Sequence, residues 1–205
     1  MMSLKVKSLQ VFLALTQVAG LTYAGSGQGG ATTEYYVKAA FVCQLIRFVE
    51  WPKGKAPEPN APTVIGIVGQ DPFGDAFDIA QVEGQGRSRL LVRRFKAQWG
   101  PDPGDPNQQQ WAEYLSQLRA CHVLYFVDPK MDGLKGVLEQ IHKGHVLSIG
   151  QCPGFLEAGG IVNLLVPDPK IRFEVNLIAA RQARLRIPAQ VLRLAVRVID
   201  QKGKD

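Results

Sequence analysis

The sequence predicts an α/β protein in which a mostly parallel sheet lies between two layers of helices, a three-layer sandwich. Short runs rich in β-branched and other apolar residues recur roughly every 25 residues. The segments between them carry apolar residues at steps of three and four, which is the spacing of an amphipathic helix. Strands that alternate with helices in this way usually run parallel, with helices on both faces of the sheet.

Amphipathic periodicity places the helices. The first is predicted over Thr32 to Val49 and ends at Trp51-Pro52, because the residue before a proline avoids the helical region. Gly144 is expected to close the helix before the third buried strand as its C-cap. The remaining predicted helices span Phe73 to Ala80, Asn107 to Leu118, Lys130 to His142, Asn176 to Arg184 and Pro188 to Ile199.

The strands fall into three kinds. Buried strands are predicted where the run is almost wholly apolar, at Thr63 to Gly69, His122 to Val127 and His145 to Ile149. Arg89 to Phe95 alternates apolar residues with arginines, so it is expected nearer an edge of the sheet. Ile161 to Val166 and Lys170 to Val175 flank a Pro-Asp-Pro turn and predict an antiparallel hairpin near the C-terminus.

The N-terminus has the features of a secretory signal peptide. Lys5 and Lys7 precede an apolar stretch, and Thr22-Tyr23-Ala24 provides small residues for cleavage. We therefore expect a signal peptide at residues 1–24, a flexible glycine-rich lead-in at 25–31, and one domain at 32–205. The apolar stretch is too short to span a bilayer, so the cleaved chain is not expected to cross the membrane itself.

The distribution of charge bears on the kind of partner that the protein could bind. The formal net charge is +6, and much of the excess lies after residue 170. Aromatic residues are not interleaved with these arginines, so nucleic acid is not an expected partner, and a solvated helix face or an acidic partner remains open.

Of the three cysteines, Cys121 and Cys152 are the one pair that could form a disulfide. Cysteines and histidines do not fall at metal-ligand spacings, so neither a metal nor a cofactor is expected, and the histidines are interpreted as surface or strand-end residues.

The glycine-rich stretch from Ser148 to Gly160 is the densest candidate site. It follows the carboxyl end of a predicted strand, where open α/β sheets bind ligands, but it has no phosphate-loop pattern. Tight-turn packing and contact with a ligand or partner remain open. A catalytic role would need Ser148 or Cys152 beside His145 and Glu157, and His145 and Ser148 are expected on opposite faces of their strand. We therefore do not expect an enzyme.

A second candidate is the alternating run from Arg172 to Asn176. Arg172, Glu174 and Asn176 are expected on one side of a strand, opposite Phe173 and Val175. This is either a plain solvent-facing side or a recognition face in which Arg172 and Glu174 orient each other.

Blocks of sequence along the chain resemble the YfiR-like family, in that family's order. They are Tyr36-Val37-Lys38-Ala39-Ala40-Phe41, Phe48-Val49-Glu50-Trp51-Pro52, Leu147-Ser148-Ile149-Gly150, Pro153 to Gly160, Ile171 to Asn176 and Leu192-Arg193-Leu194-Ala195. The resemblance implies a Rossmann-like sheet, a periplasmic location, frequent dimerisation and no established catalytic activity. It also implies a signalling regulator that represses a membrane-bound diguanylate cyclase through its periplasmic sensor domain, and so lowers cyclic di-GMP and biofilm formation.

Several expectations follow for the site and its partners. The partner would be that cyclase or another membrane receptor with a periplasmic domain, and the chain is expected to form a homodimer. The alternative is a periplasmic small-ligand receptor that acts with another membrane signalling or transport protein, its glycine-rich loop lining the pocket. The expected contact residues are Gln151, Gly154, Phe155, Glu157, Arg172, Glu174 and Asn176.

Overall fold

A computed structural model of the chain describes residues 33–58, 61–83, 89–100, 108–165 and 171–200. The predicted signal peptide and lead-in lie outside these residues. The elements in chain order are α2 (Thr33–Phe48), β1 (Thr63–Val68), α3 (Ala76–Glu83), β2 (Leu90–Phe95), α4 (Gln108–Arg119), β3 (Val123–Phe126), α5 (Met131–His142), β4 (Leu147–Gly150), β5 (Val162–Leu165), β6 (Arg172–Asn176), α6 (Leu177–Gln182), α7 (Ala189–Leu192) and β7 (Arg197–Ile199).

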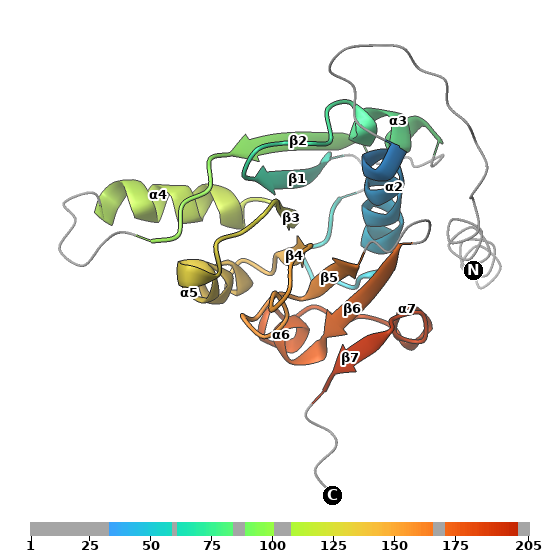
Figure 1. Cartoon of the computed structure of the whole chain (residues 1–205). Helices are drawn as coiled ribbons and strands as arrows, with labels where there is room; N and C mark the ends of the chain where they lie inside the picture. Colours follow the sequence, from blue (N-terminus) through green and yellow to red (C-terminus); the bar gives the residue numbers. More distant parts are fainter. Residues whose placement is uncertain (1–32, 59–60, 84–88, 101–107, 166–170, 201–205) are drawn as a thin grey trace, which may run out of the picture.

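The strands form one sheet in the order β2-β1-β3-β4-β5-β6-β7. All neighbours are parallel except β5 and β6, which pair antiparallel with Asn163 opposite Glu174. The predicted mostly parallel sheet with an antiparallel hairpin near the C-terminus is confirmed (Figure 1). Strands β6 and β7 run antiparallel to β1–β5. Their carboxyl ends therefore lie at the side of the sheet where the amino ends of β1–β5 lie.

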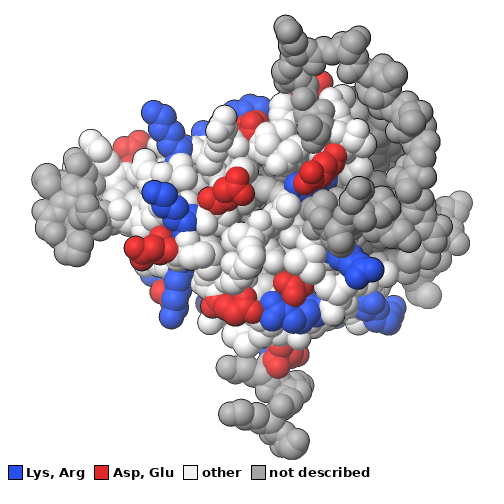
Figure 2. Space-filling model, in the orientation of Figure 1, with Lys and Arg blue, Asp and Glu red and all other residues white. Residues whose placement is uncertain are grey.

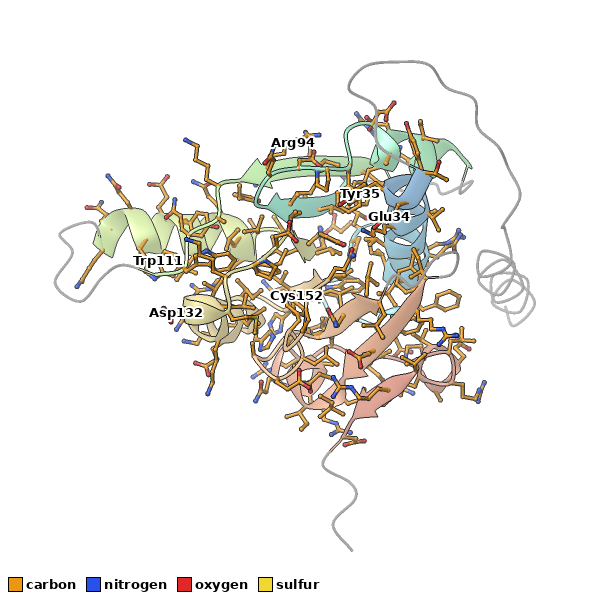
Figure 3. All side chains as sticks on the ribbon, viewed as in Figure 1. Glu34, Tyr35, Arg94, Trp111, Asp132 and Cys152 are labelled. Atoms are coloured by element: carbon orange, nitrogen blue, oxygen red, sulfur yellow. The ribbon has the colours of Figure 1, made fainter. Side chains whose placement is uncertain are left out.

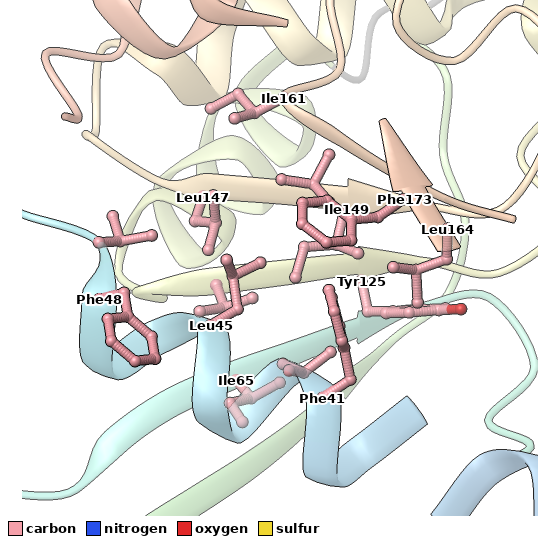
Figure 4. Packing of buried hydrophobic residues seen from close by; sticks show 14 of the residues in the cluster. Phe41, Leu45, Phe48, Ile65, Tyr125, Leu147, Ile149, Ile161, Leu164 and Phe173 are labelled. Atoms are coloured by element: carbon pink, nitrogen blue, oxygen red, sulfur yellow. The ribbon is translucent and has the colours of Figure 1, made fainter. Parts of the chain in front are cut away.

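Each face of the sheet carries its own apolar core, as the predicted three-layer arrangement requires. On one face Ile65, Tyr125 and Ile149 pack against Phe41 and Leu45 of α2 (Figure 4). On the other face, Leu124 and Phe126 pack against Leu118 of α4 and Leu138 of α5. Successive residues of a strand point to opposite faces, so β3 supplies both cores from four consecutive buried residues. Within the described ranges no helix is both long and apolar enough to cross a membrane.

The predicted closing helix at Pro188 to Ile199 is wrong. The helix there is only α7, four residues long, and the chain continues into strand β7 beside β6. The Val196 N–H donates to the Phe173 carbonyl at 2.9 Å, and Arg197 lies opposite Glu174. The apolar residues of this segment fit a helical stripe, but Val196, Val198 and Ile199 are β-branched, and the segment gains strand pairing at the free edge of the sheet. Tertiary contacts therefore overrode the helical spacing.

Two predicted features of α5 also need correction. Its first turn is not helical, because Gly133 has φ +79°, and a Cβ there would lie 2.4 Å from the Trp99 carbonyl oxygen. At its end, Gly144 does not adopt the left-handed conformation expected of a C-cap glycine, and His145 takes it instead, with φ +61°. The His145 Nδ1 lies 2.9 Å from the Ala183 carbonyl oxygen, a contact that helps to hold the ring in this conformation.

Candidate functional site

The glycine-rich loop between β4 and β5 is built around a buried aromatic ring. Phe155 has no exposed surface, and Cβ atoms added to Gly150 and Gly160 would lie within 2.6 Å and 2.1 Å of its ring. Gly154 has φ +80°, a conformation that other residues rarely adopt. These glycines therefore serve packing and a tight turn, and Phe155 is placed as a core residue rather than on the surface where a partner could touch it.

Polar side chains from the loop and the last three strands form a connected row across the sheet. Asn163, Glu174 and Arg197 lie opposite one another on β5, β6 and β7. Arg197 pairs with Glu174 at 2.7 Å and with Glu157 of the loop at 2.9 Å, and the Asn163 side chain donates to Glu174 at 3.3 Å. The hydrogen bond to Arg197 lowers the pKa of the Glu157 carboxyl. We call these four residues the polar row.

The structure differs from the expected recognition face in the partner of Glu174. Glu174 is oriented by Arg197, which the sequence analysis did not include, and not by Arg172. Arg172 is exposed at the start of β6. Glu157 and Arg197 keep about half of their side-chain surface accessible, 53% and 45%, so part of the polar row is available for contact with another molecule.

Asn176 is a structural residue. Its side-chain oxygen accepts from the Ala179 N–H at 3.0 Å and caps α6, while its side-chain nitrogen donates to the Leu156 carbonyl at 2.8 Å. It is buried, so both bonds are shielded from water. The residue joins the glycine-rich loop to the start of α6.

We expect Asn176→Ala to lower the free energy of unfolding by about 2 kcal/mol. Loss of the cap costs about 1 kcal/mol, and loss of the buried hydrogen bond to the Leu156 carbonyl, which still accepts from the Gly159 N–H, costs about another 1 kcal/mol. Asn176→Ser is the matched control, since serine keeps a capping oxygen but does not replace the bond to Leu156. Urea denaturation should place the serine variant about midway, and equal losses in both variants would contradict the two-bond account.

A second cluster lies at the carboxyl ends of β1 and β3, where the strand order reverses direction. Open α/β sheets commonly bind ligands at such a point. Lys38 of α2 is fully buried there, pairs with Glu34 and sits 4.1 Å from the centre of the Tyr35 ring. Figure 3 places Glu34 and Tyr35 together near the start of α2. The hydroxyl of Tyr125 donates to Gln151 at 3.3 Å, which ties this cluster to the glycine-rich loop.

The electrostatics of this second cluster favour uncharged phenols. Burial, reinforced by Glu34 and Asp128, raises the pKa values of both Tyr35 and Tyr125. Lys38 is balanced by Glu34, so the cluster presents little net charge. The sequence offered one signal for it: Lys38 lies three, four and seven residues before Phe41, Val42 and Leu45, which puts it on the buried stripe of its helix.

The residues considered for nucleophilic chemistry are not assembled. The Ser148 hydroxyl accepts from the Ile161 N–H at 3.0 Å, and Glu157 pairs with Arg197. Burial raises the pKa of every cysteine, to about 12 for Cys43 and about 11 for Cys121, so these thiols stay protonated at neutral pH. Within the described ranges, no group of three His, Cys, Asp or Glu side chains could hold a metal ion.

The Cys121–Cys152 disulfide is absent from the structure, where both residues are free thiols. Cys121 precedes β3 and Cys152 follows β4, which runs parallel to β3, so the two lie at opposite edges of the sheet. Cys152 instead contacts the Met131 sulfur at 3.9 Å. The sequence did not show that β3 and β4 are parallel neighbours, an arrangement that separates these two cysteines by the length of a strand.

The arginine-rich C-terminal part does not present a uniformly basic face. Arg181 pairs with Asp200, Arg186 with Glu50, and Arg197 with two carboxylates. Figure 2 shows acidic and basic side chains interspersed on the face turned to the viewer. The local surplus of positive charge is therefore partly neutralised by acidic residues from elsewhere in the chain.

The structure is a mostly parallel α/β sandwich in which polar side chains of the last three strands form a connected row. The sequence model of YfiR/HmsC-like proteins matches residues 35–196, and the chain belongs to that family. This confirms the resemblance. Proteins of this family are, in general terms, periplasmic regulators of diguanylate cyclase activity. Comparison with curated proteins found no match.

Solved structures support the fold alone. A conserved domain protein from Vibrio cholerae is similar with a TM-score of 0.51 at 14% identity, over 78% of this chain and 60% of that one. An ABC domain from Streptococcus pneumoniae, solved in complex with L-Trp, has a TM-score of 0.47 at 16% identity, over 78% and 60% of the respective chains. The chain thus spans about 60% of the length of these structures.

Proposed function

We propose that the protein is a periplasmic repressor that binds the sensor domain of a membrane-bound diguanylate cyclase and holds the enzyme inactive. The observation that carries the proposal is the family match over residues 35–196, which spans nearly all the described elements. Repression by binding requires only that the protein prefer the inactive state of its partner, which shifts the population toward that state. Cyclic di-GMP and biofilm formation would fall as a result.

The proposed contact surface is the exposed part of the polar row with its neighbours. Glu157 and Arg197 supply opposite charges at an accessible position, and Arg172 is exposed on the adjoining strand. Val196 and Val198, exposed by 52% and 38%, add apolar surface along the same free edge of the sheet. The side chain of Val198 points to the face opposite Arg197, so a partner that binds over this edge would contact the charged residues on one face and apolar surface on the other. Gln151 lies at the other end of the loop and is included only through its bond to Tyr125.

Arg197→Gln should weaken repression while leaving the fold intact. The change removes the cation that orients Glu157 and Glu174, and a lost charged contact at an interface commonly costs about tenfold in affinity. Exposed ion pairs contribute little to folding, so the melting temperature should change by only a few degrees. The measurement is cellular cyclic di-GMP in a strain that lacks the gene, expresses the partner cyclase and carries either the unchanged protein or the Arg197 variant.

Arg93→Gln is the matched control. Arg93 is exposed on β2, at the opposite edge of the sheet, so its loss should leave repression unchanged. Deleting the whole gene should raise cyclic di-GMP. Unchanged levels after deletion would contradict the proposed function, whereas full repression by the Arg197 variant would contradict the proposed surface alone.

Export and dimerisation are parts of the same proposal. Residues 1–24 would direct the chain to the periplasm, and mass spectrometry of the periplasmic protein should find an N-terminus after Ala24. Sedimentation equilibrium of the cleaved protein should give the mass of a homodimer.

A further inference from the structure

One edge of the sheet is open to further strand pairing. β7 is the last strand in the order, and in Figure 1 it lies beside β6 at the lower side of the sheet. The Val196 N–H donates to Phe173 of β6 at 2.9 Å, and successive residues of a strand direct their backbone groups to opposite sides. The N–H and C=O groups of Arg197 and Ile199 therefore face the free edge, where they could pair with another strand.

The opposite edge is guarded against such pairing. The order of strands ends there at β2, where the Leu90 N–H already donates to the Gln81 side chain at 2.9 Å. Arg93 and Arg94 are both exposed on this strand, and the described ion pairs balance only Arg94, through Asp71. Charged residues of this kind commonly protect edge strands from pairing with a second molecule. β7 is therefore the better suited of the two edges for self-association.

The surface of β7 is self-complementary. Arg197 is balanced by Glu157 and Glu174 of its own copy. On the other face of the strand Val198 lies beside Val175 of the apolar core and is 38% exposed. A two-fold axis at Val198 would bring two apolar side chains together, whereas an axis at Arg197 would bring two like charges together. The side chains thus favour an axis at Val198.

We propose that the protein forms a homodimer by antiparallel pairing of β7 with β7 of a second copy, with the two-fold axis at Val198. Arg197 then lies opposite Ile199 of the second copy, and the two residues of each such pair exchange both of their backbone hydrogen bonds. The two Val198 residues lie between these pairs, with their Cα atoms about 4.5 Å apart, and bury each other's side chains. The sheets of the two copies form one continuous sheet.

This dimer would hide the edge over which the regulatory partner is proposed to bind, since Val198 belongs to both surfaces. The effect on the partner rests on the proposed function, whereas the dimer itself does not. A copy held in the dimer could not bind the cyclase over the same edge. The homodimer would then be the form of the protein that does not repress, and the monomer the form that does.

A disulfide across the axis tests the dimer and its register. Val198→Cys, combined with Cys152→Ser to remove a partly exposed native thiol, should give a covalent dimer of the cleaved protein on mild oxidation, since disulfides span such Cα separations. Val196→Cys in the same background is the matched control. Val196 is more exposed, at 52%, but its two copies would lie about 14 Å apart, too far for a disulfide. Non-reducing gel electrophoresis measures the product. Equal crosslinking of the two variants, or none of Val198→Cys, overturns the proposal.

Repression tests the effect of the dimer separately. In cells that express the partner cyclase, the crosslinked Val198→Cys chain should lose most of its repression relative to Val198→Ser in the same background, which has a side chain of similar size but cannot crosslink. Cellular cyclic di-GMP is the measurement. Equal repression by the two variants, with the disulfide present, overturns the assignment of the dimer as the inactive form. Failure of the proposed function is distinguishable, because deletion of the gene would then leave cyclic di-GMP unchanged.

Discussion

Phe155→Ala should lower the free energy of unfolding by about 3–5 kcal/mol, the usual cost of removing a fully buried aromatic ring. The ring fills the space between Gly150 and Gly160, neither of which has a side chain that could move into the cavity left behind. It also contacts Phe126 of β3, with ring centroids 5.9 Å apart, so the cavity would open against the sheet itself. Urea denaturation followed by circular dichroism measures the loss.

Met131→Ala is the matched control for Phe155. Met131 lies beside the same loop, near Gly154, but 44% of it is exposed, so its truncation should cost less than about 1 kcal/mol. A Phe155 variant that keeps its stability but no longer represses the cyclase would show that the residue is a contact residue after all, as the sequence had suggested.

Acid should destabilise the protein through His142. This histidine is buried in α5, where loss of hydration lowers its pKa to about 4, with Glu139 acting in the opposite direction. In the unfolded chain its pKa is near 6.5, so the unfolded state binds the additional proton between those values. Its contribution to stability is therefore complete above about pH 6.5 and is lost as the pH falls toward 4. The shift corresponds to about 3 kcal/mol.

Replacing His142 by glutamine tests this directly. The variant has no group that titrates at this position, so its stability should fall about 3 kcal/mol less than that of the parent between about pH 7.5 and about pH 4. Both proteins keep the other titrating groups, and Glu157 adds the same acid dependence to each. Parallel curves for the two proteins would mean that the pKa of His142 is the same in the folded and the unfolded chain. The burial of His142 also corrects the expectation that all three histidines lie at the surface or at strand ends.

The sheet could be predicted because its signals are local. Buried parallel strands are continuous apolar runs, and those at Thr63, His122 and His145 each became a strand within two residues of the expected bounds. Arg89 to Phe95 was expected near an edge, and β2 is an edge strand. The segment after Pro188 was predicted wrongly because it pairs with β6, which lies more than about 20 residues earlier in the sequence, and no local pattern reveals that pairing.

The candidate site was harder to predict for the same reason. The expected residues include Glu157 and Glu174, but their common partner Arg197 comes from the segment whose structure was predicted wrongly. Phe155 and Asn176 drew attention through a glycine-rich loop and an alternating strand, and both are buried. A composition that allows close approach of a ligand equally allows close approach of the protein's own side chains. Only the three-dimensional arrangement shows whether a glycine-rich segment makes room for a ligand or for a side chain of the protein itself.

The reversed direction of β6 and β7 has a practical consequence for handling the protein. The described chain begins with α2 at the carboxyl edge of the sheet, whereas it ends at Asp200 beyond β7, at the amino edge. Arg197 lies three residues before Asp200. An affinity tag fused after Asp200 would thus start close to the proposed contact surface, so purification tags and fluorophores belong ahead of Thr33.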